Sequence, residues 1–249
     1  MVEDLIPPYP SKGLIFSLEE NPPARIHNRN FNVKATEGYF MPQCTHSWRM
    51  QIAGKLKMLG VFFRPGMFRH FFNLPAPELT DQVLAFEDAG IPRLKELQYR
   101  LLEHGSLAGK VQRVEEFLKK QLATFHFRPT LTDQALFLLH RKGPGCSVNN
   151  LKEELGVSSR FFRKVFYSDI GLSPKVFLKI NRFNAAFQVL RSGRFYKLSD
   201  IAYQLHYYDQ SHFIKEFKHF TDTTPLQFIK QEHPLHAQIY WRDGGEGHL

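Results

Sequence analysis

LSDIAYQLHYYDQSHFIKEFKHFTDTTPLQF, residues 198–228, decides the fold of the second half of this chain. Apolar side chains recur there at helical spacing on both sides of a short interruption at His206. Phe213, Phe217 and Phe220 share one face of the later segment, and Asp209, a good N-cap residue, stands before it. The stretch therefore predicts a helix, a tight turn, a second helix and a stop.

A copy of this pattern occurs earlier in the chain. Leu151 and Leu155 correspond to Ile201 and Leu205 at a shift of 50 residues. At a shift of 51 residues, five positions fall on identical residue types: Phe162, Lys164, Phe166, Pro174 and Phe177 on Phe213, Lys215, Phe217, Pro225 and Phe228. Such a repeat predicts two copies of one supersecondary unit, with the extra residue in the turn.

A longer helix is predicted between the two units. Ser173 is a good N-cap residue, Pro174 suits the first helical position, and Gly193 provides a stop. One face of this helix is apolar and carries Phe177, Ile180, Phe183, Ala186 and Leu190. We expect it to act as a rigid connector. A separation of about 34–36 Å between the two units would place both in successive turns of one major groove.

The two later helices of the units have opposite inner and outer faces. Over residues 158–168 the inner face holds Phe162, Val165 and Phe166, and the outer face holds Arg160, Arg163, Lys164 and Tyr167. The corresponding helix turns outward Ser211, Ile214, Lys215 and Lys218. Either helix alone is typical of an ordinary solvated amphipathic helix. Two corresponding helices with long donors outward favour insertion into the major groove.

Residues 131–230 resemble the AraC/XylS family of bacterial transcription regulators. The resemblance rests on GVSSRFFRKVFYSDIGLSPKVFLKINRFNAAFQVL (156–190), and on the DQSHF and TP-x-x-F motifs within 198–228. It implies a sequence-specific DNA-binding protein that binds double-stranded operator or promoter DNA. It also implies a cytoplasmic, nucleoid-associated location and a contact with RNA polymerase.

The resemblance further implies which residues contact DNA: Ser159, Arg160, Arg163, Lys164, Gln210, Ser211, Ile214 and Lys215. Arg163 could bind guanine with two hydrogen bonds, whereas Lys164 and Lys215 suit phosphate. Ile214 could touch a thymine methyl at most, and Gln210 could read adenine or brace the helix start. The family has glycine where this chain has His206, so a positive φ there would cost about 1 kcal/mol.

Charge and composition agree with this interpretation. Of the net charge of +9, residues 1–126 carry 16 Lys and Arg against 13 Asp and Glu, and residues 127–249 carry 17 against 11. The later half is therefore the expected partner of a polyanion. The chain has no apolar run long enough for a membrane span and no secretory signal at its start. Its two cysteines suit a reducing cytosol.

The first half predicts a mixed, strand-rich domain. Strand patterns occur at 13–20, 29–36 and 55–65, and helical patterns follow at Met67 to Phe72, 91–104 and 107–125. Overall we expect an α+β protein. Its domains would be 1–127 for effector sensing and dimerisation, 128–235 for DNA binding, and 236–249 as a tail. The resemblance implies a cupin-like barrel for the first domain, although its strand-rich part is short.

The function of the first half is left open. A small-molecule effector could meet Phe40, Trp48, Phe62 or Phe63, but core packing explains each of them more simply. The apolar stripe of 107–125 could pack within its own domain or form a homodimer. The sequence names neither the effector nor the operator, and does not tell activation from repression.

Catalytic and metal-binding patterns are absent from the sequence. The twelve histidines form no ligand motif, and no phosphate-binding loop, dinucleotide fingerprint or nucleophile elbow occurs. We therefore expect no enzyme, cofactor or metal. Two alternatives stay open: an enzyme-like first half, for which Cys44 would be the nucleophile, targeted to DNA by the second half, or a nonspecific architectural DNA binder.

Overall fold

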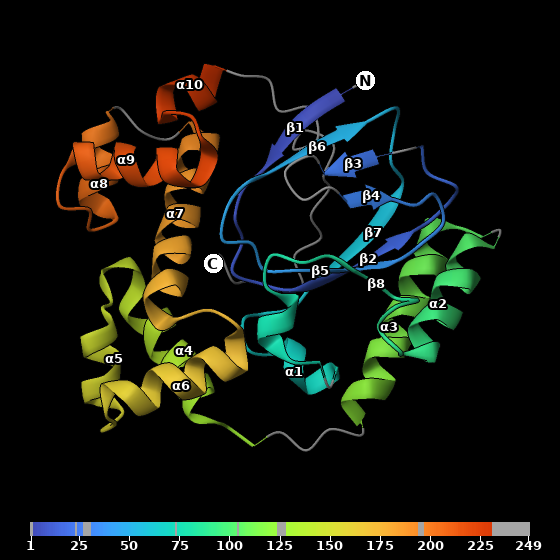
Figure 1. Cartoon of the computed structure of the whole chain (residues 1–249), viewed down its shortest axis with the longest axis horizontal. Coiled ribbons are helices and arrows are strands. Elements are labelled where there is room, and N and C mark those ends of the chain that lie inside the picture. The colour runs from blue at the N-terminus through green and yellow to red at the C-terminus, as the bar shows by residue number, and fades with distance from the viewer. Residues whose placement is uncertain are drawn as a thin grey trace.

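The computed structural model describes residues 2–22, 24–26, 31–72, 74–103, 105–123, 128–193 and 197–230. A strand-rich half and a helical half lie side by side in it (Figure 1). The predicted α+β class is confirmed. The predicted boundary after residue 127 and the predicted tail at 236–249 stay predictions, since residues 124–127 and 231–249 lie outside the described part.

The strand-rich half contains two antiparallel sheets of four strands each. The first sheet has the order β1-β6-β3-β4, from β1 (Val2–Ile6), β6 (Trp48–Ile52), β3 (Ala24–Ile26) and β4 (Phe31–Val33). The second has the order β7-β2-β5-β8, from β7 (Met58–Phe62), β2 (Gly13–Ser17), β5 (Tyr39–Met41) and β8 (Leu84–Ala85). The three predicted strand segments correspond to β2, β4 and β7, and the remaining five strands had not been predicted.

Three helices pack on the second sheet: α1 (Phe68–Phe71), α2 (Pro92–Leu102) and α3 (Leu107–Ala123). Phe40 from the sheet meets Phe68, Phe72 and Phe86 at ring-centroid distances of 5.2–5.6 Å. These aromatic contacts form the centre of the first core and explain the many phenylalanines of this half. All three predicted helical segments are confirmed, although Phe125 of the predicted stripe lies outside the described residues.

The helical half follows the predicted repeat. It contains α4 (Leu131–Lys142), α5 (Val148–Glu154), α6 (Ser159–Ile170), α7 (Pro174–Ser192), α8 (Leu198–Gln204), α9 (Gln210–Thr221) and α10 (Pro225–Lys230). The predicted N-caps are confirmed. The side chains of Ser158, Ser173 and Asp209 each accept a hydrogen bond from the backbone N–H three residues further along the chain. Helices α5 and α6 make the first unit, α8 and α9 the second, and α7 the connector.

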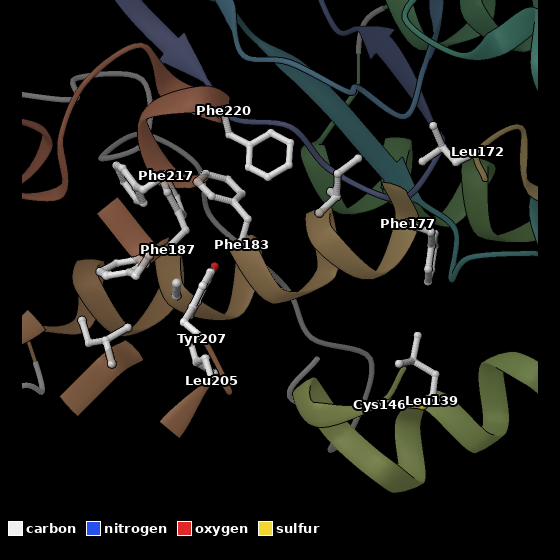
Figure 2. Packing of buried hydrophobic residues seen from close by; sticks show 14 of the residues in the cluster. Leu139, Cys146, Leu172, Phe177, Phe183, Phe187, Leu205, Tyr207, Phe217 and Phe220 are labelled. Atoms are coloured by element: carbon white, nitrogen blue, oxygen red, sulfur yellow. The ribbon is translucent and has the colours of Figure 1, made fainter. Parts of the chain in front are cut away.

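The two units share one hydrophobic core rather than having separate cores. Phe183 on α7 packs against the second unit, 5.4 Å from Phe217 and 4.9 Å from Phe220 between ring centroids, and Phe187 packs against Phe228 of α10 at 5.0 Å (Figure 2). On the other side, Phe177 meets Phe166 of the first unit at 5.4 Å. The connector therefore holds both units through aromatic packing along its length.

Candidate nucleic-acid interface

The first candidate reading helix is α6. Phe162 and Phe166 are buried on its inner face, whereas Arg160, Arg163 and Lys164 are exposed. The guanidinium Nε of Arg163 donates to the carbonyl of Ser159 at 3.1 Å, which orients this side chain along the helix. Ser159 itself is half-buried. The three cations thus lie together on the surface of one short helix, in the arrangement that the sequence predicts.

The second candidate reading helix is α9. Gln210, Ser211 and Lys215 are exposed, and Phe213, Phe217 and Phe220 are buried. Ile214 is half-buried: part of its side chain packs against the shared core and the rest is exposed. The exposed part of the Ile214 side chain leaves apolar surface for a thymine methyl. Among the predicted contacts, α9 has one exposed cation, Lys215, whereas α6 has three.

The turn before α9 has the positive φ that the family's glycine at this position implies. His206 adopts a φ of 56°, in the left-handed region. Two tyrosines flank this turn, and the sequence had not singled them out: Tyr203 is 85% exposed and Tyr208 is 91% exposed. Tyr203 lies in α8 and Tyr208 just before α9, and each hydroxyl group is a hydrogen-bond donor. Their exposure depends on the helix packing and leaves no separate signal in the sequence.

A buried ion pair attaches α9 to the connector. Arg182 of α7 donates two hydrogen bonds to Glu216 Oε1, at 2.8 and 3.1 Å, and one to Oε2 at 2.7 Å. The Arg182 guanidinium also lies over the ring of Tyr207, at 4.3 Å from its centroid. Burial raises the pKa of the Tyr207 phenol, with a further contribution from the Glu216 charge. These contacts orient the second reading helix.

The opposite ends of both reading helices contact the strand-rich half. Lys12 Nζ donates to the Ile170 carbonyl at the end of α6, at 2.6 Å, and the backbone N–H of Ser47 donates to the Phe220 carbonyl of α9, at 3.1 Å. In Figure 1 the last turn of α6 faces α1. The N-terminal ends of the reading helices, where the predicted DNA contacts begin, lie away from these contacts.

Arg69 of α1 strengthens this contact between the halves. It forms ion pairs with Asp133 of α4, at 2.9 Å, and with Asp169 of α6. A cavity of about 10 Å³ beside it is lined by residues of both halves, among them Lys12, Gln43 and Asp169. A cavity of this size has room for one water molecule at most.

The candidate effector residues lie mainly in the core. Phe40, Trp48 and Phe63 are buried, and Phe62 is partly exposed beside Tyr9. Cys44 is buried next to Ile26 and Trp48. Core packing therefore explains Phe40, Trp48 and Phe63. In the part of the chain that the structure describes, no three His, Cys, Asp or Glu side chains gather as metal ligands would. None of its helices is both long and apolar enough to cross a membrane.

Comparisons with known families agree with this geometry. A family model described as a helix-turn-helix domain matches residues 151–231, which include both units and the connector. A second model, described as a domain of unknown function (DUF6597), matches residues 2–85. No curated protein sequence matches the chain.

Solved structures extend the comparison to the whole chain. ToxT from Vibrio cholerae superposes with a TM-score of 0.52 at 11% identity, covering 92% of this chain and 93% of ToxT. ToxT from Vibrio cholerae O395 bound to (E)-4-(8-methylnaphthalen-1-yl)but-3-enoic acid gives a TM-score of 0.52 at 12% identity, covering 92% and 94%. At this identity the likeness establishes a shared fold for both halves.

The tandem helix-turn-helix fold with its two reading helices places this protein among DNA-binding transcription regulators. Its helical half is a helix-turn-helix domain of the AraC type, as the sequence resemblance implies, and its strand-rich half carries the domain of unknown function.

Proposed function

We propose that this protein is a sequence-specific regulator that reads two segments of one operator with α6 and α9. The observation that carries the proposal is the pair of capped helices in corresponding positions, each buried on one face and polar on the other. The proposed contacts are those that the resemblance implies: Ser159, Arg160, Arg163, Lys164, Gln210, Ser211, Ile214 and Lys215. With three exposed cations, α6 would supply most of the base discrimination.

Selection of bound sequences from a random pool of DNA duplexes tests this function. A sequence-specific regulator enriches one bipartite site and binds it far more tightly than random DNA. An architectural binder would instead enrich no site and would show the same dependence on salt with every duplex. Enrichment of no site would therefore overturn the proposal.

Replacing Arg163 with alanine tests the first reading helix. We expect Arg163→Ala to weaken binding to the selected site by about 1–3 kcal/mol and to relax the preference at one base pair. Arg100→Ala is the matched control, because Arg100 is an exposed arginine on α2 that pairs with Glu96. Fluorescence anisotropy with the selected and mutated sites would measure both. Equal affinity of wild type and Arg163→Ala for every duplex would remove α6 as a reader.

We also propose control by a small molecule through the strand-rich half, and action in the bacterial cytoplasm at promoters, in contact with RNA polymerase. The support for an effector is the shared fold with ToxT, one structure of which holds an organic acid. Mass spectrometry of the protein after incubation with metabolite mixtures would identify a retained compound. Burial of the Cys44 thiol in the core argues against the enzyme alternative.

A further inference from the structure

Residues 43–47 of the strand-rich half extend between the C-terminal ends of the two reading helices. At one end of this segment, Gln43 Nε2 donates to the Ile170 carbonyl at the end of α6. At the other end, the backbone N–H of Ser47 donates to the Phe220 carbonyl at the end of α9. Five residues span at most about 18 Å. This bridging segment (residues 43–47) therefore brings the two helix ends into a short, defined separation.

The bridging segment is itself held in place. Thr45 donates to Asp81 from its backbone N–H, at 2.9 Å, and from its hydroxyl. Gln43 also donates to Thr80 Oγ1, at 2.8 Å, and this hydroxyl donates in turn to the Gly171 carbonyl, at 3.0 Å. With Lys12 on the Ile170 carbonyl, the end of α6 receives three side-chain donors from the other half.

The acceptors in these hydrogen bonds are carbonyl groups at helix ends, which favour strong hydrogen bonds. The last carbonyls of a helix have no partner within the helix and carry the negative end of its dipole. Here they are covered by Lys12 and Gln43, both of which are buried. A buried carbonyl that loses its donor pays the cost of desolvation without compensation. The end of α6 is therefore firmly attached to the strand-rich half, and the end of α9 is attached by the hydrogen bond from the Ser47 backbone.

The connector α7 and the bridging segment hold the reading helices at different points. Helix α7 packs along their inner faces, through Phe177 on one side and Phe183 on the other. The bridging segment attaches their ends. Two bodies that are joined at one region can pivot about it, whereas a second attachment removes this freedom.

We infer that the bridging segment and its partners Lys12 and Thr80 fix the angle and separation of α6 and α9, and thereby the spacing of the two DNA half-sites that the protein accepts. This inference rests on the proposed function, because it concerns how two readers on one chain are aligned. These are positioning residues, since they lie at the helix ends away from the proposed DNA contacts.

Gly171 offers a way to disturb this contact. A Cβ atom at this position would lie 2.5 Å from the Ala76 carbonyl oxygen and 2.6 Å from Gln43 Nε2 and Thr80 Oγ1. Gly193, at the end of α7, is a matched control. Both glycines have a positive φ, of 89° and 65°, but a Cβ at Gly193 would meet nothing within 4 Å. An alanine therefore strains the backbone in both variants. Only in Gly171→Ala does the new Cβ also clash with neighbouring atoms.

The experiment measures half-site spacing with the full chain. The spacing between the two halves of the selected operator is changed by inserting or deleting up to four base pairs. The affinity for each duplex is then measured. Because B-DNA repeats in about 10–10.5 base pairs, one inserted pair turns the second half-site by about 35°. We expect wild type and Gly193→Ala to lose about tenfold in affinity per inserted pair, and Gly171→Ala to lose about threefold or less.

Base preference within each half-site should stay unchanged in Gly171→Ala, which separates a positioning role from a loss of contacts. Thr80→Val and Gln43→Leu remove the donors without backbone strain, and they carry the test if Gly171→Ala does not fold. The inference is overturned if all folded variants keep the narrow spacing profile of the wild type. If the wild type selects no sequence at all, the proposed function fails instead, so the two failures are distinguishable.

Discussion

Lys12 occupies a position that is unusual for a lysine. Only 5% of this residue is exposed, and its amine contacts the Ile170 carbonyl of the other half. Burial lowers the pKa of Lys12 to about 7, because the charged amine is poorly solvated there. The neutral amine can still donate the hydrogen bond, so the contact does not require the charge.

The pKa of Lys12 predicts a pH dependence of stability. Between about pH 7 and pH 10.5 the unfolded chain binds more protons at this amine than the folded protein, so the free energy of unfolding rises with pH in this window. Relative to Lys12→Met, the wild type should gain about 2 kcal/mol from pH 7 to pH 9. Urea unfolding of both proteins at the two pH values measures this gain.

The control for Lys12 is Lys57→Met. Lys57 lies at the surface of the same half and pairs with Glu19. Its replacement should leave the pH dependence of the wild type unchanged. A difference between wild type and Lys12→Met that stays constant from pH 7 to pH 9 would show that the amine is solvated in the folded protein.

At the scale of single elements, α9 depends on one buried ion pair. The side chain of Glu216 is 4% exposed, and it accepts three hydrogen bonds from Arg182 of α7. Arg182 also stacks on Tyr207 in the turn before α9. Helix, turn and connector are therefore held by the same guanidinium. Breaking a buried pair leaves a charge without compensation, which costs far more than losing a pair at the surface.

Glu216→Gln tests this attachment. We expect the free energy of unfolding to fall by about 3 kcal/mol, because Arg182 would lose its counter-charge in a buried site. Glu96→Gln should change it by about 0.5 kcal/mol or less, since Glu96 and Arg100 form an exposed pair within one helix. Denaturant titrations of both variants measure the difference. Equal stability of the two would contradict the structural role of the Arg182 pair.

At the scale of the whole molecule, helix α3 has exposed leucine side chains that suit contact with a second copy of the chain. Val114 is buried against the aromatic core, and Lys110 donates to the Leu18 carbonyl at 2.7 Å. Leu107 and Leu122, in contrast, are 62% and 47% exposed. Packing within its own domain thus accounts for Val114 in the middle of the predicted stripe, and we propose that a homodimer uses its exposed ends, Leu107 and Leu122.

The double variant Leu107→Gln with Leu122→Gln tests the dimer. If α3 forms the interface, sedimentation should show a concentration-dependent dimer for the wild type and a weaker dimer for the variant. The variant would place polar amides where the wild-type dimer buries leucine side chains. Leu226→Gln, at an exposed leucine of α10, is the control. A wild type that stays monomeric at all concentrations would refute the proposal.

The sequence by itself determined the helical half. Its caps, turns and inward-facing phenylalanines recur at short, regular spacings, and each of these signals acts within a few residues along the chain. For this reason the connector and both units could be predicted, whereas the positive φ of His206 was implied by the family's glycine at this position. The proposed DNA contacts come from the family resemblance of the same segments, and they stay a prediction.

Only the tertiary structure decided how the two halves meet. Short strands such as β3, β5 and β8 are too brief to show alternation, and they form because neighbouring strands supply their hydrogen bonds. The contact of Lys12 joins residues that are 158 positions apart. Nothing near Lys12, Gln43 or Ser47 in the chain signals that a helix end will lie beside them. They acquire their role only because folding brings the C-terminal carbonyl groups of two helices beside residues that are distant in the chain.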